Sequence, residues 1–344
     1  MNIQTDKIYY PEKQWLNPFD SNNEFDISLN PNFFSKTIDE QNNLIDRLHD
    51  KKKIFIKYCY FAYIKKFIEN EVFQTLINKF VNNDLKIVLV GDDVSFLRDD
   101  DVDYIEKNDW FFKNKNLLFY QVTYITTKKE FEQNLYIGVF VHYLLRHLLH
   151  QSEYNHFEQN HEKVFLSLNN RERKYRTKLY NLYEKLNNTE KDKLLVSFNF
   201  KNIFLEKELF PGNSGEANYE HSSLYTSDIL KFYKKCMFEI VSETMENLIT
   251  EKTYKPLLCG VPFIIYNEKT DDIINSYKNL GIDINYFDID YSNIENVNQF
   301  IKSILSQDVK SLKEKYKLAF IKAEENKVKL HQHFLNVKEK IEKL

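Results

Sequence analysis

The sequence predicts an α/β protein with two parallel-sheet domains and a C-terminal helical tail. Three observations lead to this fold class. Short apolar runs alternate with segments of helical periodicity, a pattern that favours α/β units. The pattern restarts after a polar break near residues 151–163. The chain has 344 residues, which is enough for two domains of roughly 100–200 residues each.

In the first half, apolar runs at 51–59, 85–91 and 116–125 are predicted to be strands. Residues 61–82 are predicted to form one helix, and residues 135–149 fit a strand that turns into a helix. The helix carries its apolar side chains at helical spacing: Ile64, Ile68, Val72 and Leu76.

The second half begins with a predicted strand at Val164–Asn169, a polar loop and a helix. A strand at Leu194–Phe200 completes a βαβ unit, whose crossover would make the two strands parallel. Residues 236–243 and 261–266 add two more strands, and 309–344 fit a long surface helix or a helix pair. The helix of the βαβ unit has one apolar face: Tyr175, Leu179, Leu182, Tyr183 and Leu186.

These elements predict two facing Rossmann-like domains. We place the first at residues 1–155, the second at 160–305 and the helical tail at 306–344. Ligands of such sheets bind beyond the carboxyl ends of the strands. The polar clusters of the sequence follow predicted strands, so the topology can bring them around one cleft.

Composition limits the classes of partner. The net charge is −3 and lysines are interleaved with acidic residues, so nucleic acid is not the expected partner. The cysteines Cys59, Cys236 and Cys259 lie far apart in apolar surroundings, which indicates buried free thiols in a reducing compartment. No run reaches the ~18 apolar residues of a membrane span and no signal pattern is present. We expect a cytoplasmic protein without a transmembrane segment.

Thr250-Glu251-Lys252 stands where a strand passes to a helix. Thr250 suits a helix N-cap and Gly260 suits the helix end, while Pro256 favours a kink between them. A capped surface helix explains these residues. A binding site for a phosphate-bearing ligand also explains them, because exposed N–H groups at the start of a helix favour phosphate.

The segment FEIVSETMENLITEKTYKPLLCGVPFIIY resembles the donor-binding motif of the family-10 α-1,3-fucosyltransferases and of related uncharacterised bacterial and phage glycosyltransferases. Glu243 matches the first glutamate of that motif, and Thr250, Glu251 and Lys252 match its Thr-Glu-Lys. The resemblance implies that Glu251 holds hydroxyls of the donor sugar, that Lys252 pairs with the diphosphate and that Glu243 lines the donor pocket. It covers about 30 residues.

The match is incomplete at two places. The Asn-Ser that follows the first glutamate in the family is Thr244-Met245 here, and the family's tyrosine before Val-Thr-Glu-Lys is Leu248. Both changes fall in the donor pocket, so the nucleotide base and the sugar stay open. A GDP-fucose-like donor is favoured.

A second segment, SLNNRERKYRTKLYNLYEKL, resembles the part of the family where a strand-end asparagine precedes an arginine that opens a helix. Arg176 takes the place of the diphosphate-contacting arginine, and Arg173 is the alternative. A guanidinium at a helix start can bind two phosphate oxygens at once. A solubilising basic loop is the other interpretation of this segment.

In a third segment, LVGDDVSF resembles the family's stretch that carries the general base, which implies that role for Asp92, with Asp93 adjacent. A carboxylate can take the proton of the acceptor hydroxyl in an inverting transfer. Asp101-Val102-Asp103 follows a polar turn instead of ending an apolar strand, so we expect neither a metal nor another cofactor.

We therefore predict an inverting, metal-independent glycosyltransferase of the GT-B type. It would move a hexosyl or fucosyl group from a nucleotide sugar to a glycan, a lipid-linked glycan or another hydroxyl acceptor. The donor site would consist of Arg173, Arg176, Glu243, Thr250, Glu251 and Lys252. Two alternatives stay open: a phage-type DNA-modifying glycosyltransferase, and a catalytically inactive binding module of the same fold.

Overall fold

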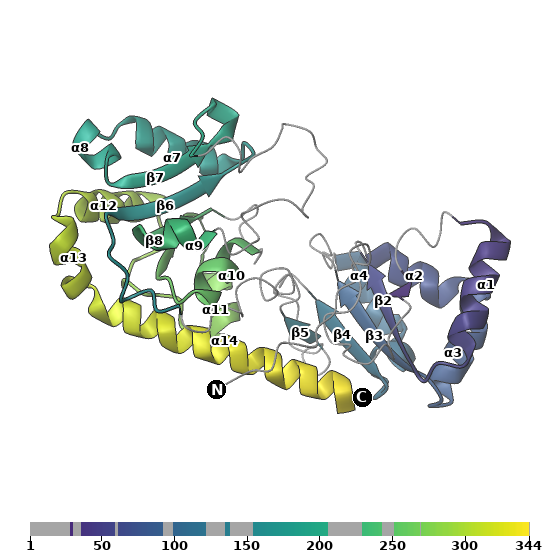
Figure 1. The fold of residues 1–344 in the computed structure, drawn as a ribbon. Helices are drawn as coiled ribbons and strands as arrows, with labels where there is room; N and C mark the ends of the chain where they lie inside the picture. Colours follow the sequence, from purple (N-terminus) through teal and green to yellow (C-terminus); the bar gives the residue numbers. More distant parts are fainter. Residues whose placement is uncertain are drawn as a thin grey trace. The chain divides into compact units, whose positions relative to one another are not determined.

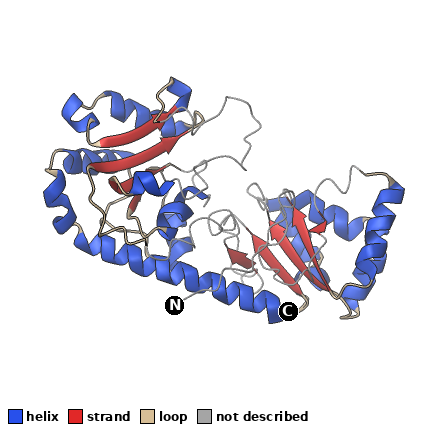
Figure 2. Cartoon of the chain, viewed as in Figure 1, coloured by secondary structure: helices blue, strands red, loops and turns tan. Residues whose placement is uncertain are grey.

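The computed structural model of the chain contains two compact units (Figures 1 and 2). One unit comprises residues 1–142 with 335–344, and the other comprises 143–334. The structure describes residues 28–29, 36–58, 61–91, 99–121, 135–137, 154–205, 229–242, 251–268 and 270–343. Each unit is built on a parallel sheet, as the alternating pattern of the sequence predicts.

The first unit has a five-stranded sheet in the order β1-β2-β3-β4-β5, with every pair parallel. Its strands are β1 (Ser28–Leu29), β2 (Lys53–Tyr58), β3 (Lys86–Gly91), β4 (Leu117–Gln121) and β5 (Leu135–Ile137). Its helices are α1 (Ile38–His49), α2 (Phe61–Glu69), α3 (Gln74–Val81), α4 (Asp99–Lys107) and α5 (Asp109–Phe112). The outer strands β1 and β5 are only 2 and 3 residues long, so β2, β3 and β4 form the main part of the sheet.

The single helix expected over residues 61–82 is wrong, because Asn70 divides it. The Asn70 side chain accepts a hydrogen bond from the backbone N–H of Val72 at 3.0 Å and opens a 3-10 turn, Glu71–Phe73. Asparagine competes with the helical backbone in this way. The apolar spacing survives the break, since Ile64 and Leu76 on either side of it are both fully buried.

The second unit has a four-stranded parallel sheet in the order β7-β6-β8-β9. Its strands are β6 (Lys163–Asn169), β7 (Leu194–Phe198), β8 (Cys236–Val241) and β9 (Phe263–Ile265). Its helices are α7 (Lys174–Glu184), α8 (Asn188–Lys191), α9 (Ile229–Tyr233), α10 (Glu251–Leu258), α11 (Asp271–Asn279), α12 (Ile294–Leu305), α13 (Val309–Lys315) and the part of α14 (Lys317–Lys343) that precedes residue 335. Every residue of β8 is buried, as a central strand of a parallel sheet requires.

Residues 309–344, for which either a long surface helix or a helix pair was expected, form the two helices α13 and α14. Its first part packs into the core of the second unit. Phe320 of α14 is 2% exposed and its ring lies 5.6 Å from that of Phe238 on β8 and 5.9 Å from that of His161. This part of α14 therefore contributes to an aromatic core against the sheet.

The predicted end of α10 at Gly260 is confirmed. Gly260 has φ +65°, its N–H donates to Leu257 O at 3.2 Å, and Val261 N–H donates to Pro256 O at 2.8 Å. This is a Schellman motif, which satisfies the last carbonyl groups of a helix. Pro256 lies inside the helix, which continues past it to Leu258.

We expect Gly260→Ala to destabilise the second unit by about 1–2 kcal/mol from backbone strain alone, because only glycine adopts positive φ without cost. A Cβ at this position would also lie 2.5 Å from Oε2 of Glu324, whose side chain must then move. Gly281→Ala is the matched control, since Gly281 has φ +74° and no atom within 4 Å of the added Cβ. Urea unfolding should show a larger loss for Gly260→Ala, and equal losses would mean that the Glu324 contact carries no cost.

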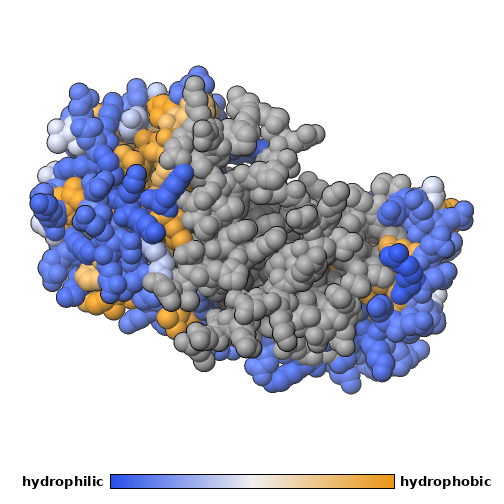
Figure 3. All heavy atoms as spheres, in the orientation of Figure 1, coloured by the Kyte–Doolittle hydropathy of each residue, from blue (hydrophilic) through white to orange (hydrophobic). Residues whose placement is uncertain are grey.

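Hydrophilic side chains cover most of the described surface in Figure 3. Within the described ranges, each helix is too short or too polar to cross a bilayer. Cys236 and Cys259 are buried free thiols, as expected, and Cys59 lies outside the described residues. Burial raises the pKa of both thiols well above the ordinary range, so neither is a reactive thiolate.

Candidate functional site at the carboxyl edge of the second sheet

The second sheet has a topological switch point between β6 and β8. From β6 the chain passes through α7 to β7 on one side of the sheet, while from β8 it passes through α10 to β9 on the other side. The connections after the two central strands therefore leave in opposite directions. Open parallel sheets bind ligands at this point, beyond the carboxyl ends of the strands.

Buried polar side chains lie at the ends of these two strands. Asn169, the last residue of β6, donates from Nδ2 to Ser167 Oγ at 3.0 Å, and Ser167 Oγ donates to Ile240 O at 3.1 Å. Asn169 is 1% exposed and Ser242, which follows β8, is 5% exposed. Among the described residues, Asn169 Oδ1 and Ser242 Oγ have no hydrogen-bond partner. Two buried acceptors at the switch point are suited to a ligand that carries hydroxyl or amino groups.

The arginines predicted for the diphosphate follow β6. Arg173 is exposed and stands at the N-cap position of α7. Arg176 lies in the first turn of α7, is 5% exposed and donates from Nη1 to Arg171 O at 3.0 Å. Arg176 is therefore a buried cation at the start of the helix that follows β6. A solubilising basic loop, the other interpretation of this segment, does not account for that burial.

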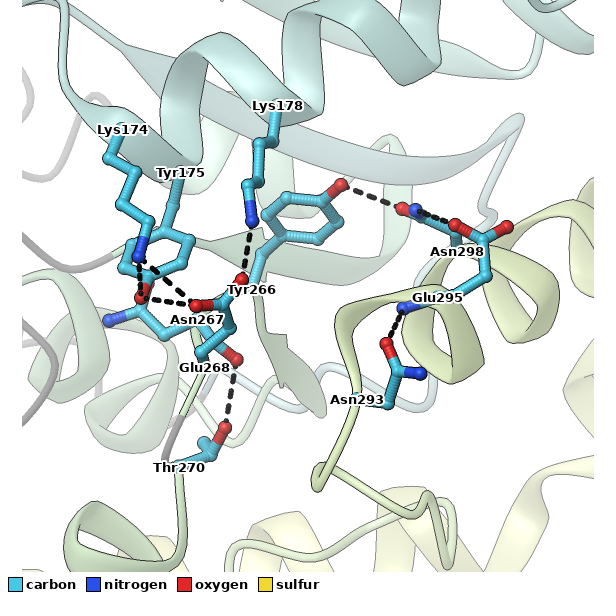
Figure 4. A network of polar contacts seen from close by, with 10 residues as sticks. All are labelled: Lys174, Tyr175, Lys178, Tyr266, Asn267, Glu268, Thr270, Asn293, Glu295 and Asn298. Atoms are coloured by element: carbon cyan, nitrogen blue, oxygen red, sulfur yellow. Dashed lines mark hydrogen bonds and ion pairs between the residues drawn. The ribbon is translucent and has the colours of Figure 1, made fainter.

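The start of α7 is held in place by ion pairs with Glu268, which follows β9 (Figure 4). Lys178 and Lys174 both bind this carboxylate, Lys174 at 3.1 Å, and the Tyr175 hydroxyl donates to it at 3.3 Å. The hydrogen bonds from the two lysines lower the pKa of Glu268 to about 2. The sequence does not predict these ion pairs, because the residues that form them are about 90 positions apart and no local pattern links them.

The residues predicted from the Thr-Glu-Lys motif follow β8. Lys252 is the second residue of α10, and its side chain is half-buried. Glu251 is the first residue of that helix, and its side chain lies outside the described set, as do residues Glu243 and Thr250. Arg176 lies on α7, which follows β6, and Lys252 lies on α10, which follows β8 and packs against it. Because β6 and β8 are neighbours in the sheet, the two helices begin after adjacent central strands (Figure 1).

The catalytic residues predicted in the first unit, Asp92 and Asp93, lie outside the described residues. They follow Gly91, the last residue of the central strand β3. The polar turn expected before Asp101 is wrong, because Asp99–Lys107 forms α4, and Asp101 pairs with Lys65 at 3.0 Å. In the part of the chain that the structure describes, no three metal-ligating side chains lie together.

Comparisons with known proteins find no match to this chain. No family model matches the chain, and neither a curated protein nor a solved structure matches it significantly. The fold and the switch point therefore define the class of protein from this chain alone: an α/β protein with two parallel sheets and a candidate ligand site in the second unit.

Proposed function

We propose that the second unit binds a nucleotide sugar at the switch point and that the protein is a glycosyltransferase. The observation that carries this proposal is the placement of Arg176 and Lys252 in the first turns of two helices that follow the adjacent strands β6 and β8. Guanidinium and ammonium groups suit the two phosphoryl groups of a nucleoside diphosphate. The buried acceptors Asn169 Oδ1 and Ser242 Oγ suit the hydroxyl groups that a sugar or ribose brings.

The resemblance to the fucosyltransferase motif supports the same site and adds roles to it. By that resemblance Glu251 holds hydroxyls of the donor sugar, Thr250 belongs to the same motif, and Glu243 lines the pocket. Two parallel-sheet units agree with the GT-B type, in which the first unit binds the acceptor and supplies the base. A GDP-fucose-like donor and a glycan acceptor are the favoured substrates.

The transfer follows from these roles. The acceptor oxygen forms a bond to the anomeric carbon of the sugar as the bond from that carbon to the diphosphate breaks. The acceptor proton passes to the carboxylate of Asp92, and the nucleoside diphosphate leaves with the electron pair of the broken bond. Arg176 and Lys252 stabilise the negative charge that grows on the leaving diphosphate.

We expect a nucleoside diphosphate or nucleotide sugar to stabilise the protein in the presence of EDTA, because cationic side chains fill the role of a metal. Lys252→Ala should weaken its binding about ten-fold to one-hundred-fold, as expected for one charge-assisted contact. Arg176→Lys keeps the positive charge but loses the bidentate contact of the guanidinium group with two phosphate oxygens, so it should also weaken binding. Isothermal titration across a panel of nucleoside diphosphates measures both effects.

Lys185→Ala is the control for this prediction, because Lys185 is an exposed lysine at the other end of α7. It should bind like the wild type. Absence of binding by every nucleotide in the panel, or binding only with Mn²⁺ or Mg²⁺, would contradict the proposed function. Equal affinities for the wild type and Lys252→Ala would mean that Lys252 does not contribute to nucleotide binding.

A further inference from the structure

Asn169 carries a hydrogen-bond acceptor whose direction is fixed by the chain around it. Its Nδ2 donates to Ser167 Oγ at 3.0 Å, and Ser167 Oγ donates to Ile240 O at 3.1 Å. Because the Ser167 hydroxyl uses its only proton in the bond to that carbonyl group, it can only accept from the amide of Asn169. The amide nitrogen of Asn169 therefore faces Ser167, and Oδ1 is the atom that has no hydrogen-bond partner.

Ser242 is the neighbour of Asn169 on the adjacent strand. β6 and β8 are parallel, and Leu166 lies opposite Glu239. The same register sets Asn169, the last residue of β6, opposite Ser242, which follows β8. Opposite residues of parallel strands point their side chains to the same face of the sheet, and neighbouring strands lie about 4.8 Å apart. The Asn169 amide and the Ser242 hydroxyl are thus adjacent groups on one face.

The chain leaves both groups unsatisfied. Each side chain is more than nine-tenths buried, and neither Asn169 Oδ1 nor Ser242 Oγ forms a hydrogen bond within the described ranges. Buried polar atoms are nearly always hydrogen-bonded, so an adjacent pair of them without partners requires an explanation. Residues 170–173, which follow Asn169, are all exposed, so the pair lies close beneath the surface at the carboxyl edge of the sheet. Ligands of open parallel sheets bind at this edge.

The two atoms together define the chemistry of a partner. Asn169 Oδ1 can only accept, so it needs an O–H or N–H group of the ligand, whereas Ser242 Oγ can donate and accept. A phosphate group does not meet the first requirement, because its oxygens are acceptors. A vicinal diol meets both requirements, because its two hydroxyl groups are adjacent and each can donate and accept. One hydroxyl would donate to Asn169 and the other would bind Ser242.

We infer that Asn169 and Ser242 bind a vicinal diol of the ligand at the switch point. The need for a hydrogen-bond donor follows from the fixed amide of Asn169 alone. The assignment of the diol to a nucleotide sugar rests on the proposed function, in which the ribose and the donor sugar each bring such a diol. The pair then distinguishes hydroxylated ligands from their deoxy analogues.

Ser242→Ala tests this pair with the smallest change in the protein, because it removes a hydroxyl that has no partner in the described chain. The full chain is titrated with a nucleoside diphosphate, its 2′,3′-dideoxy analogue and the corresponding nucleotide sugar. Ribose 5-phosphate and 2-deoxyribose 5-phosphate are added at millimolar concentration as probes without a base. We expect Ser242→Ala to weaken binding of the diol-bearing ligand about three-fold to ten-fold, as for one neutral hydrogen bond.

The ligands also identify the source of the diol. A loss of affinity for the nucleoside diphosphate assigns the diol to the ribose, and the dideoxy analogue should then bind the wild type and Ser242→Ala equally. A loss confined to the nucleotide sugar assigns the diol to the donor sugar. An equal loss for the nucleoside diphosphate and its dideoxy analogue means that Ser242 contacts another part of the ligand, which overturns the diol site.

Two further variants separate ligand binding from packing. Ser167→Ala removes the hydroxyl that orients the Asn169 amide, so it should lower both the urea midpoint and the ligand affinity. Ser303→Ala removes an exposed hydroxyl from α12 of the same unit and should change neither quantity. Without ligand, Ser242→Ala should keep the urea midpoint of the wild type. The Ser242 and Ser303 variants suffice if the Ser167 variant does not fold.

The outcomes distinguish this inference from the proposed function. Equal affinities of the wild type and Ser242→Ala for every ligand overturn the diol site. A lower urea midpoint of Ser242→Ala without ligand also overturns it, because a buried water then satisfies the pair. If the wild type still binds nucleoside diphosphates in these cases, the proposed function survives. If ribose 5-phosphate binds through Ser242 and no nucleotide binds, the diol site stands and the nucleotide-sugar function falls. A wild type that binds none of these ligands overturns both.

Discussion

Acidification from pH 7 to pH 5 should destabilise the second unit, and His156 and His161 should together contribute about 4 kcal/mol of the loss. His156 is 1% exposed, and its Nε2 donates to Met237 O at 2.8 Å while its Nδ1 accepts from the Tyr154 hydroxyl at 2.8 Å. That pattern belongs to the neutral ring. His161 lies beside it, with ring centroids 4.6 Å apart.

Burial is the main cause of the change in pKa at both histidines. It lowers the pKa of His156 to about 3, with a further contribution from His161, and that of His161 to about 4. The ammonium groups of Lys313 on α13 and Lys327 on α14 act in the same direction on His156. Both folded-state pKa values lie below the unfolded value of about 6.5. The stability is therefore complete above that value and is lost as the pH falls toward the folded-state pKa.

The size of the loss follows from proton linkage. At pH 5 each histidine binds a proton in the unfolded chain but not in the folded one, which costs about 2 kcal/mol per group. The sum is a large fraction of the roughly 5–15 kcal/mol that stabilises an ordinary domain. Because the chain has two units, a probe specific to the second is needed. Hydrogen exchange of the β8 amides, corrected for the intrinsic rate, reports the free energy of opening there.

His161→Phe is the informative variant. Neither ring nitrogen of His161 has a hydrogen-bond partner among the described residues, so phenylalanine removes the titrating group without breaking a bond. The drop in opening free energy should become about 2 kcal/mol smaller. His49→Gln, at an exposed position on α1, should not alter it. Equal protection of β8 at pH 7 and pH 5 would contradict the prediction.

Asp92→Asn should lower turnover by about 10²–10⁴-fold, with little change in donor affinity, because it removes the general base and keeps the shape of the side chain. Asp92 follows the carboxyl end of β3, a central strand of the first sheet, where parallel sheets hold their functional groups. Its role as the base rests on the resemblance to the fucosyltransferase family and on the proposed function.

The measurement is release of nucleoside diphosphate from the nucleotide sugar that the wild type binds, with water as the acceptor. Water must also lose a proton, so the reaction tests the base without knowledge of the natural acceptor. Asp93→Asn is the matched control and should do much less, because successive side chains alternate in direction if the strand geometry continues. Turnover near the wild-type rate in Asp92→Asn would place the base elsewhere and would leave an inverting mechanism without support.

The sequence by itself determined the fold class and most of the elements in the second unit. Continuous apolar runs are typical of strands that are covered on both faces, and β6 and β8 are such strands. Gly260 ends α10 as predicted, since a positive φ favours glycine regardless of the surroundings. The break at Asn70 was missed because helical periodicity continues across it, although an asparagine followed by an acidic residue is a local capping signal.

Tertiary structure decided what local patterns do not contain. The order β7-β6-β8-β9 depends on which strands pair over long separations, and this order creates the switch point. No periodicity shows that Arg176, in a basic segment of the sequence, is only 5% exposed. In the same way, α14 covers His161, whose ring stacks on that of Phe320. Burial of a charge depends on which elements meet in space, and that information is distributed over the whole chain.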